Sequence, residues 1–152
     1  MLCANLPGVK VKLIWLNAPD VIGLHDEALA DSGGFGGLRD RPLLESAVAR
    51  PQNRATYEHC SLFDLAATYC VGIAKNHAFI DGNERAGYQA AAVFLHLNGW
   101  LATPPEVEIV EMMVRVAESD AGEDEIAAWF ERNSSRLQKQ NSSRLQKRRG
   151  EV

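Results

Sequence analysis

The chain has 152 residues, of which 46% are hydrophobic, and this length and composition are typical of one globular domain with a buried core. No apolar run reaches membrane-spanning length, and the first sixteen residues lack the pattern of a secretory signal. We therefore expect a cytoplasmic protein with no membrane partner. Three cysteines without a Cys-x-x-Cys pair do not indicate a disulfide framework.

The net charge of −4 is unevenly distributed along the chain. Residues 133–152 contain six basic residues and one acidic residue, a local charge of +5, which leaves −9 on residues 1–132. An acidic body argues against a nucleic-acid groove as the main function, because neutralisation of phosphates supplies most of that affinity.

The first predicted elements are an extended segment and two helices. Alternating and β-branched residues over 9–16 predict a short strand or arm. Asn17, followed by Pro19 and Asp20, marks the start of a helix over residues 18–32, which ends at a pair of glycines. Asp40 can cap a second short helix, which we expect to stop at Pro51.

Four further helices follow. Ser61 opens a capping box for a helix that should end near Asn76, and an alanine-rich, weakly charged stretch over 84–98 predicts a central buried helix. Residues 103–106 read as another capping box, and a last short helix spans 123–132. The sequence thus predicts an all-α fold of about six helices, with the domain over residues 1–132.

The remaining residues, 133–152, form a basic tail with an internal duplication. Asn-Ser-Ser-Arg-Leu-Gln-Lys occurs at 133–139 and again at 141–147. One leucine per eight residues cannot bury an apolar stripe, so this tail is expected to be solvated or a helical extension. Weak binding of nucleic acid or of a partner is the alternative function.

The segment His77-Ala78-Phe79-Ile80-Asp81-Gly82-Asn83-Glu84-Arg85 carries the chemistry of the chain. A potential base, a carboxylate, a small turn and an arginine occur within nine residues and run directly into a helix. The N-terminus of a helix favours anions. The segment therefore indicates a phosphate site for phosphoryl or nucleotidyl transfer.

Each polar residue of this segment has a candidate role. His77 can take a proton from an incoming hydroxyl, and Asp81 can bind Mg²⁺, although it could instead cap the following helix. Gly82 allows the backbone to approach a phosphate and Asn83 tolerates unusual backbone angles, while Arg85 can hold phosphate oxygens or form a surface ion pair. Phe79 should point inward and support the loop. Histidines and cysteines elsewhere lack the spacing of zinc ligands, so we do not expect a zinc site.

The motif at 77–85 resembles the signature of the Fic/Doc family, and the chain is similar to its Doc branch. Further resemblances include Leu24-His25-Asp26, Gly37-Leu38-Arg39-Asp40, Leu44-Glu45-Ser46-Ala47 and the segment over 94–99, so that the likeness covers about residues 11–132. A nine-residue motif in matching context is specific. The resemblance implies the all-α Fic/Doc helical bundle, with the motif between two central helices.

The resemblance also implies a function. Most Fic relatives transfer AMP from ATP to a protein hydroxyl, whereas Doc toxins transfer the γ-phosphate, with elongation factor Tu as the known target. By this likeness His77, Asp81 and Arg85 would be catalytic, with His77 as the general base, Asp81 as the Mg²⁺ ligand and Gly82, Asn83, Glu84 and Arg85 as the ATP-binding residues. A Phd-type antitoxin would be the partner.

Departures from the family pattern bear on the subtype. Tyr88 stands where AMP-transferring members usually have a second arginine, and no Ser/Thr-x-x-x-Glu-Gly/Asn inhibitory helix is found, so that γ-phosphate transfer is favoured and restraint by a separate protein is expected. Glu84 would repel a triphosphate at close range unless a metal intervenes. AMP transfer, or a weakened member that acts by binding alone, therefore stays open as an alternative.

Overall fold

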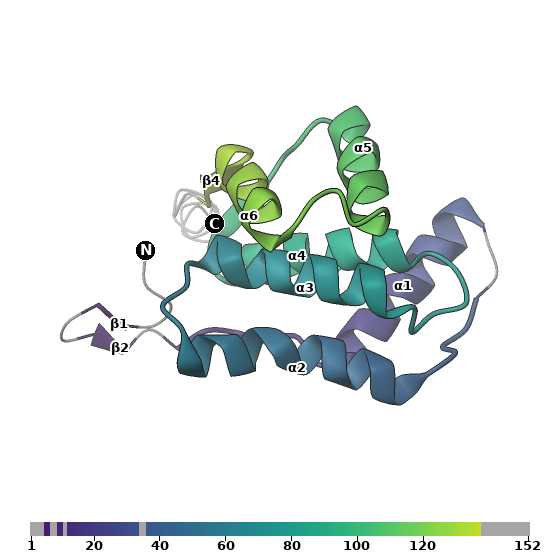
Figure 1. Ribbon diagram of the computed structural model, residues 1–152, viewed down its shortest axis with the longest axis horizontal. Coiled ribbons are helices and arrows are strands. Elements are labelled where there is room, and N and C mark those ends of the chain that lie inside the picture. Colours follow the sequence, from purple (N-terminus) through teal and green to yellow (C-terminus); the bar gives the residue numbers. More distant parts are fainter. Residues whose placement is uncertain (1–4, 7–8, 11, 34–35, 138–152) are drawn as a thin grey trace, which may run out of the picture.

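The computed structural model describes residues 5–6, 9–10, 12–33 and 36–137, and within them the chain forms six helices (Figure 1). The helices are α1 (Ala18–Ser32), α2 (Arg41–Tyr57), α3 (Leu62–Asn76), α4 (Asn83–Leu97), α5 (Glu106–Ala117) and α6 (Glu123–Arg132). Two small antiparallel sheets accompany them, β1 (Asn5–Leu6) with β2 (Val9–Lys10) and β3 (Trp100–Ala102) with β4 (Ser134–Arg136). The prediction of an all-α fold is confirmed.

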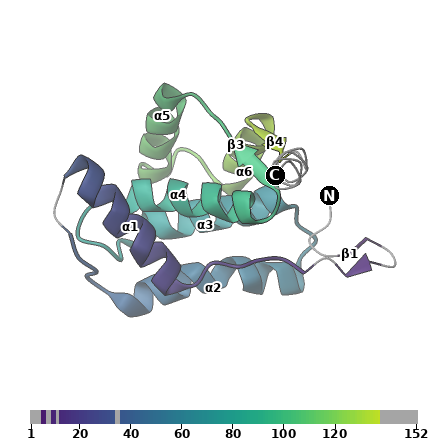
Figure 2. The ribbon, with the colours of Figure 1, turned by 180° about the vertical axis from the view of Figure 1, so that it is seen from behind.

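Helices α3 and α4 lie side by side at the centre of the molecule, and α3 also packs against α2, α5 and α6. Figure 1 shows α2 below this pair and α5 and α6 above it, and the view from behind in Figure 2 shows α1 against α4. Gly87 makes the close approach of the central helices possible, because a Cβ there would lie 2.5 Å from the carbonyl oxygen of Cys70. The predicted central helix is confirmed, and α3 shares its position.

Side-chain caps define the starts of α1 and α3 as the sequence predicts. The side chain of Asn17 accepts from the N–H of Asp20, whose carboxylate accepts from the N–H of Asn17. Ser61 and Asp64 form the same reciprocal pair before α3. These local hydrogen bonds satisfy N–H groups that have no partner inside a helix, so both boundaries could be predicted from sequence.

The predicted N-terminal strand is realised in part. Among the described residues of the predicted segment, 9–10 and 12–16, only 9 and 10 form a strand, and residues 12–17 run without regular structure to α1. Two contacts fix this arm to the bundle. The hydroxyl of Tyr69 accepts from the N–H of Leu16 at 3.0 Å, and the amide of Asn98 bonds both the N–H and the carbonyl of Ile14 at 2.9 Å.

The expected stop of the second helix at Pro51 is wrong, because α2 continues through this residue to Tyr57. A proline inside a helix costs about 3 kcal/mol, so other contacts must hold the second half of α2. Pro51 itself is buried, and Arg54, one turn later, is bound by residues of α3 and α6. These long-range contacts offset the local cost.

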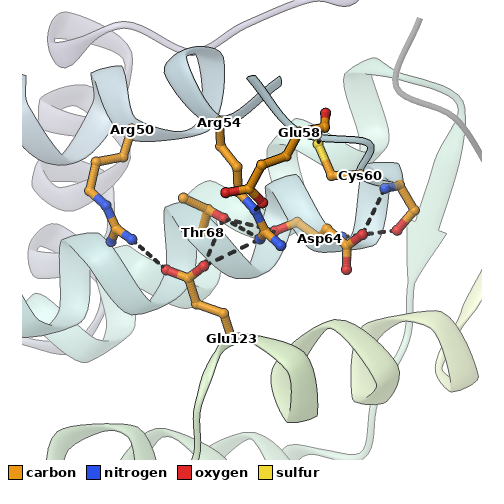
Figure 3. A network of polar contacts seen from close by, with 8 residues as sticks. Arg50, Arg54, Glu58, Cys60, Asp64, Thr68 and Glu123 are labelled. Carbon is orange, nitrogen blue, oxygen red and sulfur yellow. Dashed lines mark hydrogen bonds and ion pairs between the residues drawn. The ribbon is translucent and has the colours of Figure 1, made fainter. Parts of the chain in front are cut away.

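The contacts of Arg54 belong to a network that joins α2, α3 and α6 (Figure 3). Glu123 of α6 bonds Arg50 at 2.8 Å and Arg54 at 3.3 Å, and it accepts from the hydroxyl of Thr68 at 3.2 Å. Burial by itself would lower the pKa of the Arg54 guanidinium, but the hydrogen bond to Glu58 and the charge of Glu123 raise it overall. The network therefore fixes α6 to the layer below.

A second local prediction, the capping box at residues 103–106, is also wrong. Helix α5 starts at Glu106 after Pro105, and no side chain caps it. Thr103 instead donates its N–H to the carbonyl of Asn133 at 2.8 Å, beside the pairing of β3 with β4. A long-range backbone contact thus replaces the local cap.

The first residues of the duplicated tail form β4 and do not extend α6. Arg136 lies opposite Trp100 in the register, with its guanidinium carbon 5.4 Å from the ring centre. Residues 138–152, which include the second copy, lie outside the described residues, so the assignment of the tail as a separate segment stays a prediction.

No helix in the described part of the chain is long and apolar enough to cross a membrane. Cys60 and Cys70 are both buried, and Cys3 lies outside the described residues.

Candidate active site

The motif predicted to carry the chemistry joins the two central helices. Helix α3 ends at Asn76, and His77 caps it in the left-handed conformation, with φ 51° and ψ 41°. After the turn, α4 begins at Asn83. The side chains of His77, Asp81 and Arg85 are exposed, so the three predicted catalytic residues reach solvent at one end of the bundle.

The segment before α2 holds the start of this loop. Arg39 donates from Nε and Nη2 to the carbonyl oxygen of His77, at 3.1 and 2.6 Å. The backbone N–H groups of Arg39 and Asp40 donate to the carbonyl oxygen of Ala78, and Leu38 forms an isolated β-bridge with Phe79. The backbone of His77 is therefore fixed while its imidazole remains accessible.

Asn83 holds the middle of the loop. Its side-chain oxygen accepts from the N–H of Phe79 at 2.9 Å, and its amide nitrogen donates to the carbonyl of the same residue at 3.0 Å. Both residues are buried, with Phe79 pointing inward as predicted. The Asn83 side chain thus closes the loop, and only its backbone N–H remains for the predicted contact with a phosphate.

His25 of α1 holds the end of the loop. Its Nε2 lies 2.7 Å from the carbonyl oxygen of Asp81, and its ring stacks on Phe79 with the ring centres 3.9 Å apart. Neither His25 nor Arg39 is among the residues predicted from the sequence to form the site. The available signals were the apolar helix position of His25 and, for both residues, the segments 24–26 and 37–40 that resemble the family.

The start of α4 has the features that favour an anion at a helix N-terminus. Gly82 is the N-cap with φ 76°, a conformation that disfavours side chains, and no side chain caps the helix. The carboxylate of Asp81 accepts from the N–H of Gly82 at 2.8 Å. The first N–H groups of a helix have no partner within it and, with the helix dipole, attract a phosphate.

A pocket of about 450 Å³ opens beside this helix start. Asp81, Gly82, Glu84 and Arg85 line it on one side, and an apolar wall from α5 faces them. The wall consists of Ile109, Val110, Met113, Val114 and Ala117. A polar end and an apolar wall suit a ligand with a phosphate group and an apolar ring.

Comparison with known proteins places this site in a family. The model of the Fic/DOC family matches residues 15–95, which include α1 to α3, most of α4 and the whole motif. The chain belongs to the Fic/DOC family. The match covers every element that holds the loop, namely the helix of His25, the segment of Arg39 and both central helices.

Two relatives point to the Doc branch of the Fic/DOC family. The chain is 43% identical over 111 residues to Toxin Doc of Mycolicibacterium smegmatis, a match that covers 68% of this chain and 85% of that protein. It is 36% identical over 85 residues to Protein kinase doc of Escherichia phage P1, which covers 55% of this chain and 68% of that protein.

Tyr88 occupies the position where AMP-transferring family members usually have a second arginine. Its ring stacks on Phe130 with the ring centres 5.9 Å apart and also contacts Trp129 at 6.1 Å. Burial raises the pKa of the Tyr88 phenol. Tyr88 therefore contributes to the pocket lining a ring that is packed against Phe130 and Trp129.

The residues around Asp81 fit the Mg²⁺ site that the Fic/DOC family implies. Among the described residues, no three His, Cys, Asp or Glu side chains gather into a site of their own. Mg²⁺ does not require such a cage, because it keeps several waters and uses one or two carboxylates together with substrate phosphates. Asp81 and Glu84 both line the pocket at the phosphate end and can supply these carboxylates.

Proposed function

We propose that the protein is a Doc-type toxin that transfers the γ-phosphate of ATP to a hydroxyl group of a target protein. The observation that carries the proposal is the pocket that Asp81, Gly82, Glu84 and Arg85 line at the uncapped start of α4. His77, at the other end of the same loop, is exposed. The relatives named Toxin Doc and Protein kinase doc support the choice of reaction.

In this reaction the imidazole of His77 takes the proton of the acceptor hydroxyl. The hydroxyl oxygen forms a bond to the γ-phosphorus, while the bond from that phosphorus to the β–γ bridging oxygen breaks and ADP leaves. The N–H groups at the start of α4 and the guanidinium of Arg85 hold phosphate oxygens, and Asp81 orients a Mg²⁺ ion when it is bound. That ion neutralises charge on the phosphates.

The apolar wall of α5 and the ring of Tyr88 would receive the apolar part of the nucleotide. Glu84 lies in the first turn of α4 and lines the same pocket. A carboxylate there repels bare phosphates, so we assign it to the metal side of the nucleotide. ATP and Mg²⁺ are accordingly the proposed co-substrate and cofactor.

The target and the partner are part of the proposal. Elongation factor Tu is the proposed target and a Phd-type antitoxin the proposed partner, both acting in the cytoplasm. AMP transfer from the same site is the second candidate, since Gly82 at the helix start has no side chain to limit the approach of a phosphate group.

The deciding experiment follows the labelled atom of ATP. The purified protein is incubated with Mg²⁺, cell extract or purified elongation factor Tu, and ATP labelled in either the γ- or the α-phosphate. The proposal expects γ-label on the target with Mg²⁺ and no label with the Asp81→Asn variant, which keeps the shape of the side chain but loses its charge. Incorporation of α-label would replace kinase activity by AMP transfer, and no label with growth arrest intact would leave binding as the function.

A further inference from the structure

His25 is a buried polar residue that the proposed reaction does not use directly. Only 2% of its surface is exposed, and Nε2 lies 2.7 Å from the carbonyl oxygen of Asp81. A carbonyl can only accept, so Nε2 carries the proton and donates it. Nδ1 is buried without a hydrogen-bond partner, 3.9 Å from the carboxylate of Asp26. The ring therefore makes one specific hydrogen bond through Nε2 and leaves Nδ1 buried without a partner.

That hydrogen bond acts on a single peptide unit. The carbonyl of Asp81 and the N–H of Gly82 belong to the same planar peptide group, so fixing the direction of one fixes the other. The N–H of Gly82 in turn donates to Oδ1 of the Asp81 carboxylate at 2.8 Å. A chain of two hydrogen bonds therefore runs from the His25 ring, through one peptide plane, to the carboxylate.

The surroundings of the His25 ring place it against this peptide plane. Phe79 stacks on the His25 ring with an angle of 11° between the planes. Gly82 has φ 76°, and a Cβ at that position would meet Nε2 of His25 at 3.4 Å. The His25 ring therefore lies directly against the turn, within van der Waals reach of a Cβ at position 82.

We propose that His25 is a positioning residue that orients the carboxylate of Asp81 for the metal-bound nucleotide. The inference rests on the proposed function, because Asp81 is there the metal ligand. An ordinary core role would require only the ring and its stacking on Phe79. The orienting role requires a donor at Nε2, and this requirement separates the two.

The test compares two substitutions at this position. His25→Phe keeps a ring for stacking and removes the donor, whereas His25→Gln removes the ring and offers an amide donor. Tyr69→Phe is the matched control, because it deletes another buried donor to a backbone carbonyl, that of Leu16, away from the loop. Affinity for Mn²⁺ is measured by electron paramagnetic resonance with a non-hydrolysable ATP analogue, and kcat and KM are measured with labelled ATP.

Loss of a contact that orients a metal ligand typically weakens metal affinity by about 10- to 100-fold. We expect His25→Phe to show such a loss together with a lower kcat, His25→Gln to recover part of both, and Tyr69→Phe to match wild type. Equal behaviour of His25→Phe and Tyr69→Phe, or no recovery in His25→Gln, would overturn the inference.

A measurement on the wild-type protein keeps the inference testable if a variant does not fold. Nitrogen-15 spectra of the His25 ring should show a protonated Nε2, with hydrogen-bond coupling to the carbonyl carbon of Asp81. A ring protonated on Nδ1 only would contradict the orienting role. The absence of any phosphate transfer by the wild type would refute the proposed function, and would leave this spectroscopic result standing by itself.

Discussion

The motif loop and the network between α2, α3 and α6 are both rich in polar residues, but they arrange their charges in opposite ways. In the network, which Figure 3 shows, Glu123 lies between the guanidinium groups of Arg50 and Arg54 and also accepts a hydrogen bond from the hydroxyl of Thr68. In the loop, the residues that hold the backbone are His25, Arg39 and Asn83, and all three bond backbone atoms. The charged side chain of Asp81 is left exposed at the pocket.

This difference distinguishes polar residues that stabilise the fold from polar residues that are available to a ligand. Charges that pair with one another in a partly buried place stabilise one arrangement of helices, and removing one partner is costly. A loop that is fixed through its backbone can present its side chains to a ligand without changing shape. Pre-organisation of this kind is what a phosphate-transfer site needs, because catalysis there depends mainly on positioning and electrostatics.

The largest expected effect is on the reaction, from His77→Asn. Asparagine tolerates the left-handed backbone that His77 adopts, so the variant removes the imidazole and keeps the turn. Loss of a general base should lower the rate of phosphate transfer by about 10²- to 10⁴-fold. The free energy of unfolding, measured with urea, should change by less than about 0.5 kcal/mol. Retention of the rate in this variant would remove His77 from the mechanism.

The next effect is on stability, from Glu123→Ala in the network. The side chains of Glu123 and Arg54 are 22% and 20% exposed, so removal of the carboxylate leaves a largely buried guanidinium short of a partner. We expect a loss of about 2 to 3 kcal/mol in the free energy of unfolding and a nearly unchanged transfer rate of the folded protein.

A matched control for this prediction is Arg41→Ala. The ion pair of Arg41 with Glu45 has the same chemistry, but its side chains are 53% and 57% exposed. Its loss should cost less than about 0.5 kcal/mol. If the two variants were equally stable, the network would not be what holds α6 in place.

Asn83→Ala is expected to affect both properties, because this residue lies in the loop but acts through buried hydrogen bonds. The variant leaves the N–H and the carbonyl of Phe79 unsatisfied inside the protein, at a cost of about 2 kcal/mol. The transfer rate should also fall, because the turn before α4 loses the two side-chain hydrogen bonds that hold it closed.

Asn98 provides the control for this variant. Its amide bonds both backbone groups of Ile14 in the same manner, but Ile14 is 51% exposed, so water can replace the lost bonds. Asn98→Ala should therefore cost less than Asn83→Ala in urea unfolding and should leave transfer unchanged. A loss of transfer in the control would show that general destabilisation, and not the loop, sets the rate.

The fold was predictable where its signals are local. The caps at Asn17 and Ser61 and the spacing of apolar residues marked helix starts and helix faces correctly. The errors at Pro51 and Thr103 have one cause, since in both places contacts with residues far along the chain override the local preference. Such contacts leave no trace in a window of neighbouring residues.

The sequence could predict which residues of the candidate site face solvent, but not which residues support the loop. The residues that face solvent lie within nine positions of one another, so the pattern was visible. His25 and Arg39 reach the loop from 56 and 38 positions away. The apolar wall of the pocket comes from α5, outside the motif, and its position depends on how α5 packs on the central helices.

The smallest effect is expected from a polar contact that belongs to neither region, that of Tyr69 with Leu16. Tyr69→Phe deletes the two neutral hydrogen bonds between the phenol and the backbone of Leu16 and should cost about 1 kcal/mol at neutral pH. Burial raises the pKa of the Tyr69 phenol from 10.0 to about 12. The unfolded chain then loses this proton first, so the stabilisation from the buried phenol is complete below pH 10 and is lost as the pH rises toward 12. Unfolding of the two proteins in urea at a series of pH values should show a shallower decline for the variant above pH 10. Equal slopes would mean that the pKa of Tyr69 is the same in the folded and the unfolded protein. The phenol would then be accessible to water in the folded state, because the arm at residues 12–17 opens without unfolding the bundle.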